Sequence, residues 1–263
     1  MNLNLENKRA LVLGASSGLG FCVAKTLARE GARTVISSSD EKRITEAAKN
    51  IKQETNRAAI PFKADFSNKT EISNLIEKTL EALGGIDLLF TNTGGPPPGY
   101  FMDFGDDDWQ NAFETQLLYL VRVLKLVIPI MQKEEGGRIV NNTSISVKEP
   151  IDNLLFSNVF RAGVAGLSKT LANQYAKDNI IINCTAPGYT KTERLKSLFD
   201  ARAAAQGRTP AEIERQITSG IPLGRIPEPE EFAEVVAFLL SERSSAVSGA
   251  IITIDGGVTK CLF

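Results

Sequence analysis

The most constraining feature of this sequence is a repeated alternation between short apolar runs and longer amphipathic segments. Arg9 to Leu13 (RALVL) has the pattern of a buried strand. Leu19, Val23 and Leu27 then recur every four positions, which places them on one helical face. Further strands are predicted at 33–37, 59–64, 86–91, 137–144, 180–185 and 250–254. This alternation predicts an α/β fold, a single doubly wound parallel sheet with helices on both faces.

The domain organisation follows from the same pattern. A single domain over residues 1–263 is the simplest interpretation, because we find no linker, repeat or low-complexity segment. A long helix is predicted from Asp106–Asp108 to about Pro129. Residues 191–220, here called the lid segment, break the alternation with helical patterns only. We interpret the lid segment as a helical insertion over a substrate pocket.

Composition excludes several classes of function. The chain has no histidine, which removes His-based acid–base chemistry, Ser–His triads and most zinc sites, so no metal is expected. The net charge of −1 without a basic block gives no indication of a nucleic-acid partner. The three cysteines are far apart and are interpreted as reduced thiols. Without a secretory signal or a long apolar run, a cytoplasmic protein with no membrane partner is expected.

The segment GASSGLG, from Gly14 to Gly20, lies between a predicted strand and a predicted helix. Glycine permits positive φ angles and close backbone approach, and a helix N-terminus offers free N–H groups to a phosphate. A plain strand-to-helix turn is the alternative, because three glycines alone are weak evidence. The residues predicted to hold a dinucleotide phosphate are Gly14, Ser16, Ser17, Gly18, Leu19 and Gly20.

Six further segments follow in an order that carries a family resemblance. They are ADF (64–66), TNTGG (91–95), RIVNNTS (138–144), APGYTKT (186–192), PLGRIPEPEE (222–231) and ITIDGG (252–257). With GASSGLG they resemble the short-chain dehydrogenase/reductase family, near its 3-oxoacyl-carrier-protein reductase branch, over nearly the whole chain. The resemblance implies a Rossmann-like fold and a nicotinamide cofactor. The further cofactor contacts that it implies are Asp65, Phe66, Asn92, Thr93, Gly94, Pro187, Gly188, Thr190 and Thr192.

The segment SSSD, after the second predicted strand, bears on the choice of cofactor. An acidic residue there would bind the ribose hydroxyls and repel a 2′-phosphate, but Ser38 takes that position. Ser38 and Ser39, with Lys42 or Arg43, are candidates to bind the phosphate, whereas Asp40 would weaken it. NADP(H) is therefore favoured over NAD(H). The alternative is that the serines only cap the following helix.

The family resemblance also places four catalytic positions in this sequence. The family's serine corresponds to Ser144, its tyrosine to Ser157, its lysine to Arg161 and its asparagine to Gln116. A serine hydroxyl is a much weaker acid than a tyrosine, and it is shorter. Arg161 stays charged, so it can hold ribose hydroxyls but cannot relay protons as an amine can. Alternatively, Ser157 and Arg161 line a subunit contact, and Ser144 merely caps a strand end.

A replacement proton donor is therefore needed if the chain is an active enzyme. Lys148, four residues after Ser144, is the first candidate. Tyr189, Tyr100 and Tyr119 are the others, because they come from loops or a helix near the expected pocket. The GGPPPG run at 94–99 is predicted to be stiff, either as a pocket wall or as a surface loop.

Three hypotheses for the function remain open at this point. The first is an NAD(P)(H)-dependent oxidoreductase acting on the carbonyl or alcohol of a small-molecule or acyl-carrier substrate, with an altered proton relay. The second is a catalytically silent dinucleotide-binding sensor or partner subunit. The third is a lyase or epimerase-like use of the same pocket. The resemblance also implies a homo-oligomer, a tetramer or dimer.

Overall fold

The computed structural model describes residues 2–262, so residues 1 and 263 of the expected domain lie outside the described part. Its seven parallel strands form one sheet. The strands are β1 (Arg9–Leu13), β2 (Arg33–Ser38), β3 (Ala59–Lys63), β4 (Leu88–Thr91), β5 (Gly137–Asn142), β6 (Ile180–Pro187) and β7 (Ile251–Ile254). Their order in the sheet is β3-β2-β1-β4-β5-β6-β7. The predicted doubly wound parallel fold is confirmed, and its order reverses between β1 and β4, where such sheets bind ligands.

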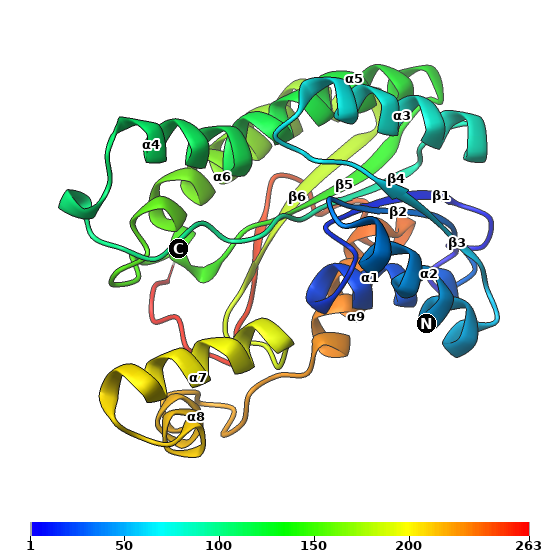
Figure 1. Cartoon of the computed structure of the whole chain (residues 1–263). Helices are drawn as coiled ribbons and strands as arrows, with labels where there is room; N and C mark the ends of the chain where they lie inside the picture. The colour runs from blue at the N-terminus through cyan, green and yellow to red at the C-terminus, as the bar shows by residue number, and fades with distance from the viewer. Residues whose placement is uncertain (1, 263) are drawn as a thin grey trace.

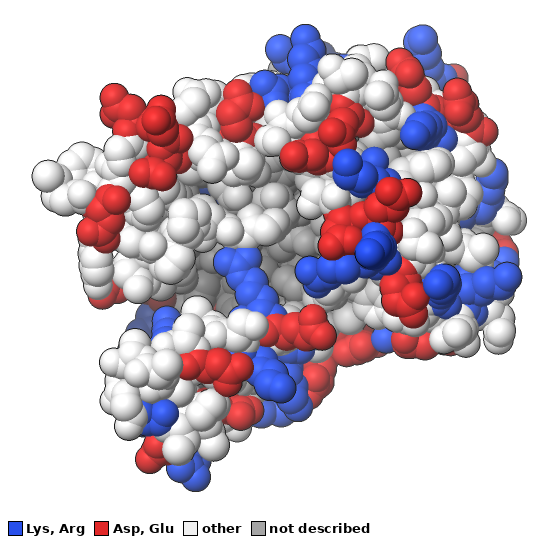
Figure 2. Space-filling model, viewed as in Figure 1, with Lys and Arg blue, Asp and Glu red and all other residues white. Residues whose placement is uncertain are grey.

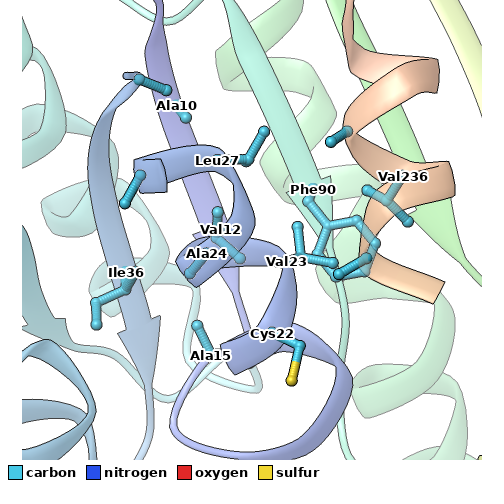
Figure 3. Close-up of a cluster of buried hydrophobic side chains, with 14 of the residues drawn as sticks. Ala10, Val12, Ala15, Cys22, Val23, Ala24, Leu27, Ile36, Phe90 and Val236 are labelled. Atoms are coloured by element: carbon cyan, nitrogen blue, oxygen red, sulfur yellow. The ribbon is translucent and has the colours of Figure 1, made fainter. Parts of the chain in front are cut away.

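Two helical layers cover the two faces of the sheet (Figure 1). Both faces need cover, because successive side chains of a strand point to opposite faces and both sets are apolar here. In β1, Ala10 and Val12 pack on one layer, and Leu11 and Leu13 pack on the other. The first layer consists of α1 (Gly18–Arg29), α2 (Glu41–Thr55) and α9 (Pro229–Leu240). Figure 3 shows this layer where Val23 of α1, Phe90 of β4 and Val236 of α9 meet. The second layer consists of α3 (Lys69–Leu83), α5 (Tyr119–Lys133) and α6 (Leu155–Tyr175).

The predicted long helix is more complex than expected. It consists of α4 (Asp106–Phe113), a π-helical segment (Glu114–Leu118) and α5, which continues to Lys133. The predicted end near Pro129 is therefore wrong, because Pro129 lies inside α5. Pro129 and Lys125, one turn earlier, are both on the exposed side of the helix. The Lys125 carbonyl that loses its helical donor can therefore be solvated.

The lid segment contains two helices, α7 (Glu193–Gln206) and α8 (Pro210–Ser219), which confirms its all-helical pattern. They pack on each other through a small apolar cluster of their own, with Leu195 and Phe199 of α7 against Ile213 of α8. In Figure 1 this pair lies to one side of the layered body. Its function as a substrate lid stays a prediction.

Residues 2–262 contain neither a membrane-spanning helix nor a carboxylate or thiol cluster for a metal ion. None of these residues belongs to a helix that is long and apolar enough to cross a membrane. No group of three or more cysteine, aspartate or glutamate side chains in this range is placed to hold a metal ion. Cys22 and Cys184 are buried free thiols, and burial raises the pKa of both, to about 12 and about 11.

An ion-pair network joins β1 to β4 at the amino ends of these strands. The Arg9 guanidinium contacts both carboxylate oxygens of Asp87, at 2.6 and 3.0 Å, and also reaches Glu134 at 2.8 Å. The backbone N–H of Arg9 donates to the same Asp87 carboxylate at 2.7 Å. Burial pushes the pKa of Asp87 upward, but the hydrogen bonds and charge of Arg9 outweigh it, so that pKa lies below its usual value.

Replacing Asp87 with asparagine should lower the free energy of unfolding at pH 7 by about 1–2 kcal/mol. Because the folded-state pKa of Asp87 is depressed, its contribution is complete above the unfolded pKa of about 3.9 and disappears as the pH falls through the folded value. Urea titrations at pH 7, 5 and 3.5 should therefore show the gap between wild type and Asp87→Asn closing with acid. Glu134→Gln, which removes only the more exposed partner, should cost less than about 1 kcal/mol. A gap that is independent of pH would contradict the assignment.

Candidate active site

The turn between β1 and α1 has the backbone geometry of a phosphate cradle. Gly14 and Gly18 have φ of 63° and 58°, in the left-handed region that favours glycine. A Cβ at Gly14 would lie 2.6 Å from the carbonyl oxygen of Asn92, and a Cβ at Gly20 would overlap the carbonyl oxygen of Gly14. Glycine is therefore required for α1 to begin this close to the sheet.

The N-terminus of α1 offers unused donors to a ligand. Ser17 precedes the helix in an extended conformation, and its side chain makes no capping hydrogen bond. The N–H groups of Gly18, Leu19 and Gly20 find no acceptor in the described chain. Ser16 and Ser17 line a groove beside them. Free N–H groups together with the helix dipole form an anion site, which supports the phosphate interpretation of this turn.

A cation from α2 lies at the same turn. The Arg43 guanidinium donates to the Ser17 hydroxyl at 3.0 Å. The carboxylate of Asp40 is occupied as the cap of α2, where it accepts from the Arg43 N–H at 3.0 Å. The Ser38 hydroxyl is directed to the Asp40 carbonyl at 3.3 Å, and Ser39 is exposed. The 2′-phosphate of NADP(H) is expected beside position 38. A positive charge therefore lies near that position, and the residue at position 38 has no carboxylate.

The loop after β3 carries Asp65 and Phe66, two of the predicted cofactor contacts. Asp65 is exposed, and its carboxylate accepts from the N–H and hydroxyl of Ser67 at 2.9 and 2.8 Å. The ring of Phe66 stacks on Tyr119, with ring centroids 6.0 Å apart. Phe66 thus packs toward the core, and Asp65 is the more accessible of the two.

A chain of hydrogen bonds crosses the carboxyl ends of β1, β4, β5 and β6. The side-chain Nδ2 of Asn92 donates to the Gly14 carbonyl at 3.2 Å. The side-chain Oδ1 of Asn92 accepts from the Asn142 side chain at 2.9 Å. Asn142 in turn accepts from the Thr185 hydroxyl at 3.1 Å. Sequence reasoning missed Asn142 and Thr185, although polar residues that end a buried run were available as an indication. These hydrogen bonds fix the glycine turn at Gly14 relative to the centre of the sheet.

Arg161, in α6 of the second helical layer, joins this hydrogen-bond network. Its Nη1 donates to the Asn142 carbonyl oxygen at 2.8 Å, and the residue is only 5% exposed. No carboxylate among residues 2–262 forms an ion pair with it. Burial lowers the pKa of Arg161, the Tyr119 phenol opposes this, and the charge of Arg194 lowers it further. The guanidinium stays charged, so a buried charge without a counter-charge faces the site.

Ser157 does not stand free in the site. Its hydroxyl shares a hydrogen bond of 3.0 Å with the hydroxyl of Ser146, a residue that sequence reasoning did not single out. The N–H of Ser146 donates to the Ser144 hydroxyl at 3.2 Å, so Ser144 caps the short 3₁₀ helix η3 (Ile145–Val147). Ser157 and Arg161 are both buried inside the chain itself, which leaves little of either side chain for the subunit contact considered as an alternative.

Gln116 lies in the π-helical segment and holds the loop after β4. Its Nε2 donates to the Gly94 carbonyl at 3.0 Å, and the Thr93 hydroxyl reaches the carbonyl of Thr115 at 3.5 Å. The Oε1 of Gln116 is buried and finds no donor among the described residues. The extra residue in a π turn shifts the helix face, a device that is frequent at functional sites.

The loop from Pro187 to Thr192 returns to the glycine turn between β1 and α1. The buried Thr190 donates to the Gly188 carbonyl at 3.4 Å, which tightens the loop. Thr192 caps α7, and its methyl carbon would lie 3.5 Å from a Cβ at Gly18. The loop predicted to contact the cofactor and the turn predicted to hold phosphate therefore border one groove, which Thr192 and Gly18 both line.

The four candidate proton donors lie in different surroundings. Tyr100 is 56% exposed, and its hydroxyl donates to Asp152 at 3.3 Å. Tyr119 is 1% exposed in the core, where burial raises its pKa against the effects of Arg161 and a hydrogen bond with Thr91. The ring of Tyr189 packs against the apolar cluster of the lid segment. Lys148, at the end of η3, is half-buried, and its ammonium has no hydrogen-bond partner in the part of the chain that the structure describes.

Comparison with known proteins gives a consistent result. Residues 14–259 match the family model described as enoyl-(acyl carrier protein) reductase. A 3-oxoacyl-[acyl-carrier-protein] reductase of Chlamydia muridarum is 32% identical, over 98% of this chain and all of that protein. Dehydrogenase/reductase SDR family member 4 of Caenorhabditis elegans is 34% identical, over 96% of this chain and 95% of its own length. L-sorbose reductase from Gluconobacter frateurii, solved with NADPH and L-sorbose, superposes with a TM-score of 0.95 at 30% identity, over the whole of both chains.

The buried, unpaired charge of Arg161 should lower the free energy of unfolding of the wild-type protein. Arg161→Met removes the desolvated guanidinium at similar length, so we expect the free energy of unfolding to rise by about 1–2 kcal/mol in urea titrations. Arg122→Met serves as the control, because Arg122 pairs with Glu114 at 2.7 Å and its loss should lower stability. If both variants lose stability, the hydrogen bond to Asn142 outweighs the cost of burying Arg161.

Proposed function

Because the chain belongs to the short-chain dehydrogenase/reductase family, we propose that it is an NADP(H)-dependent oxidoreductase that interconverts a carbonyl compound and its alcohol. One observation carries the proposal. The hydrogen-bonded chain from Gly14 through Asn92 and Asn142 ends at Arg161, so free N–H donors and a buried guanidinium belong to one connected edge. This is the arrangement that a long ligand with several anionic and hydroxyl groups requires.

The residues of this edge fit a nicotinamide dinucleotide. In the proposal, the N–H groups at the start of α1 hold the pyrophosphate, and Arg43 with Ser38 and Ser39 holds the 2′-phosphate. Arg161 takes the position of the family's lysine and holds the nicotinamide ribose. When bound, the nicotinamide supplies or accepts the hydride.

The chemistry at the carbonyl group differs from the family pattern. In the proposal, Ser144 donates a hydrogen bond to the substrate oxygen, while Ser157 stands where the family has its tyrosine. Ser157 is a weak acid and already shares a hydrogen bond with Ser146, so it is unsuited to give the proton. In the proposal Lys148 fills that role, because it follows η3, which Ser144 caps at the other end, and its ammonium has no hydrogen-bond partner in the described chain. Gln116 positions the loop at Gly94.

A catalytically silent NADP(H)-binding protein is the second candidate. The hydrogen bond between Ser157 and Ser146 favours it, because the position of the family's proton donor is occupied by a tied, weakly acidic group. The chain's own substrate, its cytoplasmic location and its assembly as a tetramer or dimer stay predictions.

Turnover separates the two candidates. Wild-type protein should oxidise NADPH above background, monitored by absorbance, with at least one member of a panel of ketoses, simple ketones, oxo acids and 3-oxoacyl thioesters. Lys148→Met should lower kcat by about 10²–10⁴ with NADPH affinity unchanged, because it removes the proton donor. Lys196→Met, an exposed lysine of α7, is the matched control and should keep its rate. An inert wild type that still binds NADPH would establish the silent candidate, and an unchanged kcat in Lys148→Met would exclude Lys148 as the donor.

Cofactor preference should depend on Arg43. Arg43→Ala should weaken NADPH binding about tenfold or more, measured by quenching of protein fluorescence, and should leave NADH binding unchanged, because only NADPH carries the 2′-phosphate. Lys49→Ala removes a charge from the same helix, where Lys49 pairs with Glu46, and should change neither affinity. Equal losses for NADPH and NADH would instead assign Arg43 to the pyrophosphate.

A further inference from the structure

Arg194, the second residue of α7, reaches from the lid segment to the edge of the sheet. A Cβ at Gly95 would overlap its Nη1, Nη2 and Cζ atoms, so the guanidinium rests on the backbone of the loop after β4. Gly95 follows Gly94, which Gln116 holds by its carbonyl. Arg194 therefore belongs to the wall of the candidate active site, although sequence reasoning did not single it out.

Arg194 and Arg161 place two positive charges at the same site. Both residues border the loop after β4, because Arg161 bonds to Asn142, which holds Asn92, and Arg194 rests on Gly95. The charge of Arg194 also lowers the pKa of Arg161. Neither forms an ion pair with a carboxylate of the described chain. Figure 2 shows a hollow between the lid segment and the body, with Lys and Arg side chains at its lid side. Arg194 is exposed to solvent, whereas Arg161 is buried, so a bound anion would offset the desolvation of Arg161 and the repulsion between the two charges.

The cofactor phosphates have other partners. The N–H groups at the start of α1 and the Arg43 guanidinium surround Ser17, on the β1 and β2 side of the sheet. Arg194 instead contacts the loop after β4 at Gly95, next to the residues that Gln116 and Thr93 organise. In the proposed binding mode, an anion bound there lies at the loop after β4 and not at the N-terminus of α1, which holds the pyrophosphate.

We propose that the substrate is an oxo acid, whose carboxylate binds Arg194 while Arg161 reinforces the positive potential beneath it. The inference rests on the proposed function and names its substrate class. A guanidinium presents two parallel N–H donors that match both carboxylate oxygens, which gives orientation as well as affinity. An anchored carboxylate fixes the distance from the lid segment to the carbonyl group that is reduced.

The test compares oxo acids with their methyl esters. Pyruvate, acetoacetate and levulinate differ in the spacing between carboxylate and ketone, and each methyl ester keeps the ketone without the charge. The complex of the full chain with NADP⁺ is titrated with each compound by calorimetry. We expect at least one acid to bind about tenfold or more tightly than its ester, and Arg194→Gln to abolish that preference with NADP⁺ affinity unchanged. Arg194→Lys should keep part of it.

Lys196→Gln is the matched control, because it removes the same charge from the same helix about 200° away around its axis. The inference is overturned if the acids and esters bind the wild-type complex equally, if no acid binds, or if Lys196→Gln has the effect of Arg194→Gln. Weaker NADP⁺ binding by Arg194→Gln, with the acid preference kept, would reassign Arg194 to the cofactor and also overturn it. Failure of wild type to bind NADPH would instead remove the proposed function on which the inference rests.

Discussion

The hydrogen bonds among Asn92, Asn142 and Thr185 are the constraint on which the rest of this site depends. Parallel strands end at a common edge, and polar side chains buried at that edge must find partners in one another. Here the partners lie on successive strands, so the network locks the ends of β4, β5 and β6 together and extends to the turn at Gly14. Asn142 adds a further link, because its backbone carbonyl receives Arg161. The same bonds therefore stabilise the edge and position the groups that would meet a ligand.

The charges at this edge show the opposing demands of stability and binding. Arg161 is buried with one hydrogen bond and no carboxylate of the described chain, an arrangement that folding alone does not favour. Arg9 shows the contrast, because two carboxylates surround it at the other end of the sheet. Arg9 thus has carboxylate partners at the amino ends of β1 and β4, whereas Arg161, at the carboxyl ends of the strands, has none in the described part of the chain. An anionic ligand would supply the negative charge that Arg161 lacks in the folded chain.

Sequence patterns predicted most of the fold because local periodicity reflects local burial. The strands from Arg9 and Arg33, the helical lid segment and the glycine turn from Gly14 are all confirmed. The end of the long helix was wrong, because Pro129 is tolerated on the exposed face of a helix whose buried face continues to Met131. Proline rules describe the backbone of one segment, whereas packing on the sheet decided where α5 stops.

The sequence alone determined the parallel sheet, the order of its helices and the position of the glycine turn at Gly14, since these depend on the spacing of apolar residues and glycines. Only the tertiary structure decided which polar groups meet. Ser157 bonds to Ser146, eleven positions earlier, and Arg194 rests on Gly95 from a helix nearly a hundred residues later. The periodicity of the sequence indicates neither contact, because each depends on how whole elements pack against one another. The physical reason is that burial repeats along a chain, whereas the pairing of side chains across a site is fixed once, by the fold.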